Sequence, residues 1–199
     1  MARTRATDFE EKQNAILASA AAVFAEQGMD KASMAQIASR SQVSKALLYH
    51  YYPSKDALIF AIIHAHLSDL DAAIEAADRP ELPPQARLRA LVSAVLENYR
   101  GADNEHKVQL NAAGALTDDQ RVEIEQIERR IVRRFSAVLD VINPDLRRKE
   151  RPLLMPVTMS LFGMMNWVYM WFREGGPLTR EDYAEVATTL ILEGIRGVR

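Results

Sequence analysis

The sequence predicts an all-α protein of about nine helices, in which a helix-turn-helix domain of three helices precedes a larger helical domain. Three observations favour this fold class. Apolar residues recur three and four positions apart along most of the chain, which is the helical period. Capping and stop residues stand where helices are expected to start and end. No stretch alternates apolar and polar residues as a half-buried strand does, and no internal repeat appears.

The N-terminal helices are bracketed by local signals. We expect helices over residues 8–27, 33–40, 44–52 and 54–77. The expected caps and stops are, in chain order, Thr7 or Asp8, Gly28, Ser33, Ser44 and Pro53. The fourth helix is apolar all round from Leu58 to Ile63, which predicts burial on several sides.

The later helices are longer on average. They are expected over residues 84–100, 104–115, 117–142, 153–173 and 179–197. Thr117 and Thr179 are suitable N-caps, each followed by acidic residues in the first turn. Asn143-Pro144 and Gly175-Gly176-Pro177 supply the breaks between the last three helices.

Composition and charge limit the class of protein. The chain has 199 residues, no cysteine and a net charge of −2, so disulfides and thiolate metal sites are excluded and a cytoplasmic location is expected. The first residues carry no apolar run, so no secretory signal is expected. Residues 31–55 contain four cations and no acid. A mildly acidic protein with such a local cationic face can still bind DNA.

Residues 33–55 read as a DNA-binding helix-turn-helix. Ala38 is small enough for the crossing of the two helices, and Ile37, Val43 and Leu48 can lock them together. Residues 49–52 provide three phenols and one imidazole, which can donate to phosphate oxygens wherever they are exposed. The alternative is an aromatic cluster that packs a small three-helix domain while its lysines are merely solvated.

This stretch resembles the DNA-binding domain of the TetR family of bacterial regulators. The resemblance rests on Val43-Ser44-Lys45, Leu48-Tyr49-His50-Tyr51-Tyr52 and Ser54-Lys55-Asp56-Ala57-Leu58, preceded by Phe24, Gly28, Ser33, Ile37 and Ala38. It implies a domain boundary after residue 55. It also implies the following DNA contacts: Ser33, Ser44, Lys45, Ala46, Leu47, Tyr49, His50 and Lys55.

Two positions depart from the family pattern. Gln42 stands in the turn where the family usually has Gly, and it should cost up to about 1 kcal/mol if that position needs a positive φ. Ala46 stands where the family often has Gly, and its methyl group can contact a thymine methyl.

By the same resemblance, residues 56–199 form a ligand-binding and dimerisation domain. An effector is expected between the fourth, fifth, seventh and eighth helices, and a homodimer through the eighth and ninth. A DNA-bound dimer needs its reading helices about 34–36 Å apart, or a multiple, and an effector would change this separation. The expected ligand-binding residues are Phe60, His64, Leu67, Val95, Asn98, Tyr99, Phe162, Asn166 and Trp167.

The segment 163–181 is similar to the C-terminal region of a TetR branch that responds to acyl-CoA thioesters, including fatty acyl and phenylacetyl ones. The shared residues are Asn166-Trp167, Tyr169, Trp171-Phe172-Arg173, Gly176-Pro177-Leu178-Thr179 and Glu181. The resemblance marks either the effector or a dimer interface. Cations for CoA phosphates are available at Arg129, Arg130, Arg133 and Arg134 and, beyond that helix, at Arg147-Arg148-Lys149. The alternative is that basic residues late in a helix suit its dipole and are solvated.

Other functions stay open at this point. A regulator of efflux that responds to hydrophobic drugs fits the same features. Residues 152–172 are free of charge and long enough to span a bilayer, so a membrane-anchored or protein-binding helical module is the main rival, although no membrane association is expected. No enzyme signature or cofactor motif appears, so neither catalytic residues nor cofactors are expected. His64 and His66, two residues apart, do not share a helix face, which argues against a metal site.

Overall fold

The computed structural model describes residues 2–112 and 114–198, and every regular element among them is helical. This confirms the predicted all-α class. By packing, the chain divides into two units, Met1–Ser68 with Gly101–Glu125, and Asp69–Arg100 with Gln126–Arg199. Two of the three division points fall inside long helices, α4 and α7, and the third lies between α5 and α6. The boundary predicted after residue 55 separates a DNA-binding part from a ligand-binding part, and it stays a prediction.

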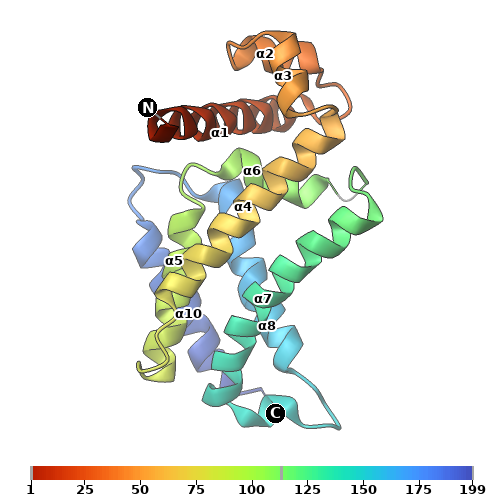
Figure 1. Cartoon of the computed structure of the whole chain (residues 1–199). Helices are drawn as coiled ribbons and strands as arrows, with labels where there is room; N and C mark the ends of the chain where they lie inside the picture. Colours follow the sequence, from red (N-terminus) through yellow and green to blue (C-terminus); the bar gives the residue numbers. More distant parts are fainter. Residues whose placement is uncertain (1, 113, 199) are drawn as a thin grey trace. The chain divides into compact units, whose positions relative to one another are not determined.

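The first unit contains the helix-turn-helix. Its elements are α1 (Ala2–Gln27), α2 (Met34–Arg40), α3 (Lys45–Tyr51), the start of α4 (Lys55–Ala77), α6 (Asp103–Asn111) and the start of α7 (Asp118–Ile142). Figure 1 shows α2 and α3 beside α1 (red to orange). Ile16 and Phe24 of α1, Ile37 of α2 and Leu48 of α3 are buried, so these helices share one core. Helix α6 also contacts α1.

Helix α1 starts earlier than predicted. It begins at Ala2 rather than near residue 8, so neither Thr7 nor Asp8 is its cap. The residues before Asp8 include Ala and Arg, which are good helix formers, and this propensity outweighs the local capping signal. Its end is as predicted, because Gly28 has a φ of 81° and donates its amide to the Phe24 carbonyl at 2.9 Å.

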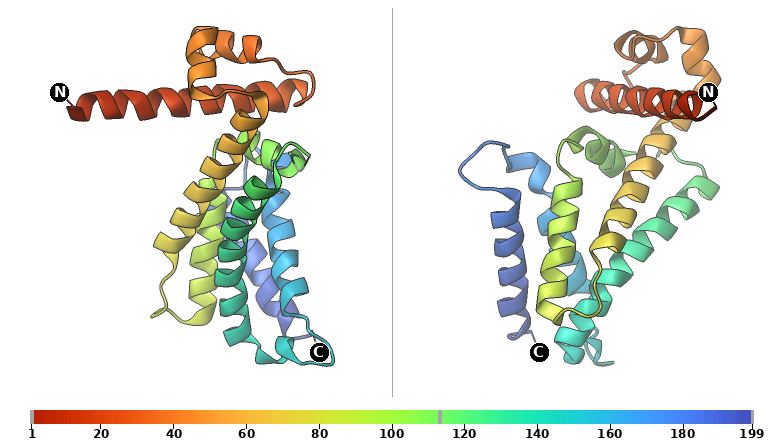
Figure 2. Two further views of the ribbon diagram at one scale, coloured as in Figure 1. Left: turned by 45° about the vertical axis from the view of Figure 1, so that its right-hand side comes forward. Right: turned by 60° about the vertical axis from the view of Figure 1, so that its left-hand side comes forward.

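The second unit contains the remaining helices. After the end of α4 come α5 (Pro84–Asn98), the rest of α7, a 3-10 turn at Pro144–Arg147, α8 (Leu154–Asn166), α9 (Val168–Trp171) and α10 (Arg180–Ile195). Helix α10 packs on α5 and α8, and Figure 2 shows α5 (lime) beside α10 (blue). In the core of the second unit, the rings of Phe135 and Phe162 meet edge to face, with centroids 4.9 Å apart.

The helix predicted over residues 153–173 is broken at Trp167. This residue ends α8 and begins α9, and its amide reaches back to Gly163 at 3.3 Å. Helix α8 has 13 residues, whereas a membrane span needs about 20. Within the described residues, α4 is the helix whose length and composition would allow a span. Half of its most apolar window is buried in the protein, as expected of a core helix.

A buried histidine pair makes the stability of the first unit depend on pH. His66 of α4 and His106 of α6 are both buried, and their rings meet edge to face at 5.8 Å. Burial, together with the nearby His106, lowers the pKa of His66 from 6.5 to about 4. The unfolded chain therefore binds a proton below pH 6.5 that the folded chain binds only near pH 4, so stability falls as the pH is lowered through this window.

We expect the free energy of unfolding to drop by about 2 kcal/mol from pH 7.5 to pH 5 on account of His66. Urea unfolding at a series of pH values measures it. In His66→Asn the same series should be flatter over this range. An unchanged slope in that variant would show that other groups cause the pH dependence.

Candidate nucleic-acid interface

Two serine caps fix the helices of the helix-turn-helix, as predicted. Ser33 accepts a hydrogen bond from the Gln36 amide at 3.3 Å, and the Gln36 side chain accepts one from the Ser33 amide at 2.9 Å. This reciprocal pair is a capping box. Ser44 accepts from the Leu47 amide at 3.1 Å. The two caps therefore set the start of each helix.

The turn between α2 and α3 is a Schellman motif. Gln42 donates its amide to Ser39 at 3.2 Å, and Val43 donates to Ala38 at 3.0 Å. Gln42 has a φ of 55°, the left-handed region that glycine adopts most easily. The condition under which Gln42 is strained is therefore met.

Gln42→Gly should raise the free energy of unfolding by about 0.5–1 kcal/mol, because it removes the strain of a side chain at positive φ. Denaturant unfolding of the two proteins measures the difference. Gln42→Ala is the matched control, because it shortens the side chain but keeps the strain. Equal stability of the Gly and Ala variants would contradict this account.

The aromatic run after Leu48 splits between core and surface. Tyr52 is buried, and burial raises the pKa of its phenol. Tyr51 is half-buried, with its ring 5.1 Å from Phe9 of α1. Tyr49 and His50 are exposed, Tyr49 to 50%. Only the last two are therefore free to face a nucleic acid, and the packing alternative accounts for Tyr51 and Tyr52.

Most of the predicted DNA contacts lie on an exposed face. Helix α3 exposes Lys45, Ala46, Tyr49 and His50, and the caps Ser33 and Ser44 are exposed as well. Leu47 is half-buried. Together they form one outward surface of the helix-turn-helix, which is here called the reading surface.

The cations around the reading surface differ in availability. Arg40 is bound to Glu26 of α1 through two hydrogen bonds, at 2.5 and 2.8 Å. Lys55 is half-buried, and its ammonium donates to the carbonyls of Met29 at 2.6 Å and Asp30 at 3.3 Å. Lys55, predicted to contact DNA, thus ties the start of α4 to the loop after α1. Lys45 is exposed and makes no hydrogen bond or ion pair within the described residues.

Three of the predicted effector residues belong to the first unit. Phe60 and His64 are half-buried, with ring centroids 5.6 Å apart, and Leu67 is buried. His64 lies 3.1 Å from the Glu123 carboxylate of α7. No group of three or more potential metal ligands occurs among the described residues.

The other predicted effector residues belong to the second unit. Tyr99 and Asn166 are joined there, because the Tyr99 hydroxyl donates to Asn166 Oδ1 at 2.9 Å. Burial, followed by the field of Glu128, raises the pKa of the Tyr99 phenol, so it remains a neutral donor. Val95 and Phe162 are buried, and the Oδ1 atom of half-buried Asn98 is buried without a hydrogen-bond partner.

Trp167 is different, because it is 58% exposed on the surface. Its predicted role in ligand binding receives no support from this position. A cleft of about 510 Å³ lies elsewhere in the unit, where α7 and α10 end. It is lined by Gln85, Ile142, Asn143, Asp145, Arg148, Leu192, Glu193, Ile195, Arg196 and Val198. None of the nine expected ligand-binding residues is among them, although Arg148 is one of the predicted phosphate ligands.

The segment 166–181 builds a corner between α8 and α10. Arg180 is 6% exposed there, and sequence reasoning missed it. Its guanidinium donates to the Leu96 carbonyl at 2.9 Å and to Glu174 at 2.6 Å, and it lies 4.9 Å from the centre of the Phe172 ring. Thr179 caps α10 in a capping box with Asp182. Much of the acyl-CoA-branch resemblance therefore coincides with structural contacts.

The arginines of α7 are partly engaged. Arg130 donates to Asp71 at 2.8 Å, and Arg134 lies 3.1 Å from Glu75 and 3.7 Å from Asp71, all within the second unit. Arg133 is exposed. Two of the four phosphate-ligand candidates on α7 thus already hold α7 against the end of α4.

Several large apolar side chains from α8 to α10 are exposed. They are exposed by 44–60% and comprise Met155, Met159, Trp167, Met170, Trp171, Val186 and Leu190. We call this set of residues the apolar face. An exposed group of large apolar residues is typical of a protein–protein contact.

Two family profiles match the chain. The profile described as "Bacterial regulatory proteins, tetR family" matches residues 16–62, which contain the reading surface. The profile described as "Tetracyclin repressor-like, C-terminal domain" matches residues 81–195, from the loop before α5 to the end of α10.

Curated relatives carry names of regulators. The HTH-type transcriptional repressor KstR2 of Mycobacterium tuberculosis is 26% identical over 187 residues, 92% of each chain. The HTH-type transcriptional activator FasR of Mycolicibacterium smegmatis is 34% identical over 88 residues, which are 44% of this chain and only 40% of FasR.

Solved structures agree over nearly the whole chain. A TetR-family transcriptional regulator from Bordetella parapertussis 12822 is similar with a TM-score of 0.83 at 30% identity, covering 94% of this chain and 97% of that one. AibR in complex with isovaleryl coenzyme A and operator DNA is similar with a TM-score of 0.76 at 26% identity, covering 90% and 97%.

Proposed function

The chain belongs to the TetR family of bacterial regulatory proteins, and from this premise we propose that it is a homodimeric transcriptional repressor that a small-molecule effector releases from its operator. We further propose that the effector is an acyl-CoA thioester or a related hydrophobic or aromatic acid. As a member of this family the protein is a DNA-binding regulator and not an enzyme.

The reading surface carries the DNA-binding part of the proposal. Lys45, Tyr49 and His50 extend outward from α3, while Leu48 and Ile37 anchor α2 and α3 in the core. Phosphate contacts position such a helix, and side chains near its start read base edges in the major groove. Ala46 offers a methyl group at the start of α3, where it would favour contact with a thymine methyl.

The apolar face supports a dimer with a second copy of the chain. A DNA-bound helix-turn-helix regulator uses two reading surfaces at a fixed spacing, which needs a stable interface between subunits. The exposed methionines and tryptophans of α8 and α9, with Val186 and Leu190 of α10, supply apolar area suited to a self-complementary contact.

Leu190→Arg should convert the dimer to a monomer, because it places two charges in the centre of the proposed interface. Leu190 is 60% exposed, so the fold of one chain does not depend on it. Sedimentation velocity measures the oligomeric state, and Glu181→Arg, exposed at the start of the same helix, is the control. Leu190→Arg protein that remains dimeric would place the interface elsewhere.

The effector class rests on two observations. AibR, solved with isovaleryl coenzyme A and operator DNA, is similar over nine-tenths of this chain. The hydrogen bond between Tyr99 and Asn166, beside the unpartnered Asn98 oxygen, places polar groups within an otherwise apolar region of the second unit. Such a combination of apolar walls and a few polar groups is usual in ligand sites.

A thermal-shift screen tests the effector class. Acyl-CoAs of several chain lengths, phenylacetyl-CoA, the matching free acids, free CoA and unrelated hydrophobic drugs are compared at equal concentrations. A thioester at 100 times its Kd should stabilise the folded protein by about 2.7 kcal/mol. Stabilisation by free acids alone would show that the effector is a free acid and not its thioester. Stabilisation by drugs alone would favour a regulator of efflux.

The sign of regulation needs a separate measurement, since one relative is named a repressor and another an activator. A reporter driven by the operator should rise when the protein is absent. A fall in its absence would assign activation instead of repression.

A further inference from the structure

We infer that Lys12 and Lys31 bind the DNA phosphate backbone on the two flanks of α3, which adds α1 and the loop after it to the DNA-binding surface. This inference rests on the proposed DNA-binding function. Neither lysine is among the predicted DNA contacts, although Lys31 belongs to the cationic stretch 31–55.

The first step is the extent of α1. The helix starts at Ala2 and is therefore regular through Phe9 and Lys12. Phe9 is 48% exposed, and its ring lies 5.1 Å from Tyr51 at the end of α3. The N-terminal part of α1 thus touches the end of the reading helix.

The second step is the register of charge on α1. Lys12 follows Phe9 by three residues and lies on the same side of the helix. Glu11 is turned away from Phe9 by about 200°. The lysine is therefore on the side of α1 that meets α3, whereas Glu11 is not.

The third step is availability. Lys12 and Lys31 are exposed, and neither has an ion pair or hydrogen bond with the described residues. Arg40 and Lys55, by contrast, are bound to Glu26 and to two backbone carbonyls. Among the side chains that the structure describes, Lys12, Lys31 and Lys45 are thus exposed cations of this domain without an internal partner.

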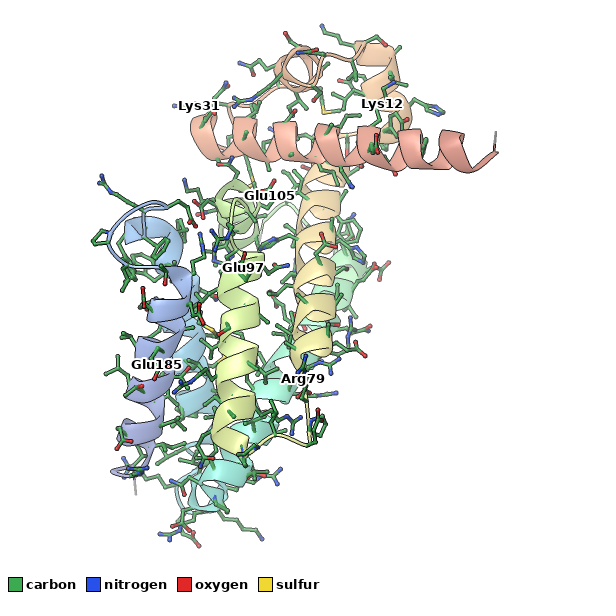
Figure 3. All side chains as sticks on the ribbon, turned by 90° about the vertical axis from the view of Figure 1, so that its left-hand side faces the viewer. Lys12, Lys31, Arg79, Glu97, Glu105 and Glu185 are labelled. Atoms are coloured by element: carbon green, nitrogen blue, oxygen red, sulfur yellow. The ribbon has the colours of Figure 1, made fainter. Side chains whose placement is uncertain are left out.

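The fourth step is spacing. Figure 3 shows Lys12 and Lys31 toward opposite ends of α1, on the side where α2 and α3 lie. The helix rises about 1.5 Å per residue, so the 15 residues from Lys12 to Gln27, the last residue of α1 and four residues before Lys31, cover about 22 Å. This exceeds the major-groove width of about 12 Å, so two lysines can reach the phosphates on either side of the groove that α3 enters.

The test uses the full-length protein and its upstream operator DNA at several salt concentrations. Each lysine contact with phosphate contributes about 0.9 to the slope of log K against log salt. Lys12→Ala and Lys31→Ala, present in both subunits, should each lower the slope by about 1.8. Binding at 0.15 M salt should weaken about thirtyfold, equally for operator and unrelated DNA.

Arg121→Ala is the matched control, because it removes one exposed cation of the same unit from α7. It should leave the slope unchanged. An unchanged slope in both lysine variants, or an equal loss in Arg121→Ala, would overturn the inference. The proposed function is tested separately, by the double variant with Lys45→Ala and Tyr49→Ala. If the wild-type protein binds the operator and this variant binds it far more weakly, the proposed function stands even when the inference about Lys12 and Lys31 fails.

Discussion

Replacing Lys45 and Tyr49 together with alanine should weaken operator binding about 1,000-fold. Both side chains are exposed on α3, and Lys45 makes no internal ion pair within the described residues. In a dimer the variant loses four contacts, and about 1 kcal/mol for each gives this factor. The slope of log K against log salt should fall by about 1.8 from the two lysines alone. Fluorescence anisotropy with labelled operator measures both quantities.

The control removes an ion pair of the helix-turn-helix domain that includes no residue of the reading surface. Arg40→Ala combined with Glu26→Ala deletes the ion pair between α2 and α1 and leaves the net charge unchanged. We expect operator affinity to fall less than tenfold, because the Arg40 guanidinium and the Glu26 carboxylate are paired with each other rather than available to DNA. An operator affinity that responds to this pair as strongly as to Lys45 and Tyr49 would mean that DNA is not bound by the outer face of α3.

The helix-turn-helix was predictable because its capping and turn residues are close together in sequence. Ser33 and Gln36 are three residues apart and form a capping box, and Ser44 caps α3 through one hydrogen bond from the Leu47 amide. The cost of Gln42 was stated conditionally, from the glycine that the family usually has in this turn, and the φ of 55° meets that condition. Signals of this range need no knowledge of tertiary structure.

The partners of the cations were not predictable, because they lie far away in sequence. Arg40 pairs with Glu26, 14 residues earlier, and Lys55 with the Met29 carbonyl, 26 residues earlier. A lysine in a DNA-binding pattern was therefore assigned to phosphate, although its ammonium is held by backbone carbonyls. Burial and tertiary contacts, rather than charge, separate a free cation from one already bound.

The segment 163–181 shows a similar ambiguity. Its resemblance to an acyl-CoA-responsive branch suggested ligand contacts, and the structure gives several of these residues packing or capping roles instead. Trp167 breaks the predicted helix although the break itself carries no proline or glycine, so the usual sequence signals did not reveal it. A motif that builds a corner and an exposed apolar face can be shared within a branch whatever its ligand.

That corner depends on Arg180, and Arg180→Met should lower the free energy of unfolding by about 3 kcal/mol. The guanidinium is the donor to the Leu96 carbonyl, which is left unsatisfied in the variant, and it also binds Glu174 and the face of Phe172. Methionine keeps the length of the side chain and its apolar contacts, so the loss measures the polar contacts. For a chain of this size, Tm should fall by roughly 6–12 °C.

Arg100→Met separates this effect from the loss of a surface charge. Arg100 also pairs with Glu174, at 3.2 Å, but half of its side chain is exposed, so its removal should cost less than about 1 kcal/mol. Arg180→Lys should fall in between, because an ammonium keeps the charge but cannot reproduce the planar fork that reaches a carbonyl and a carboxylate together. Equal losses for Arg100→Met and Arg180→Met would show that the ion pairs of Glu174, and not the buried bond to Leu96, hold α10 against α5.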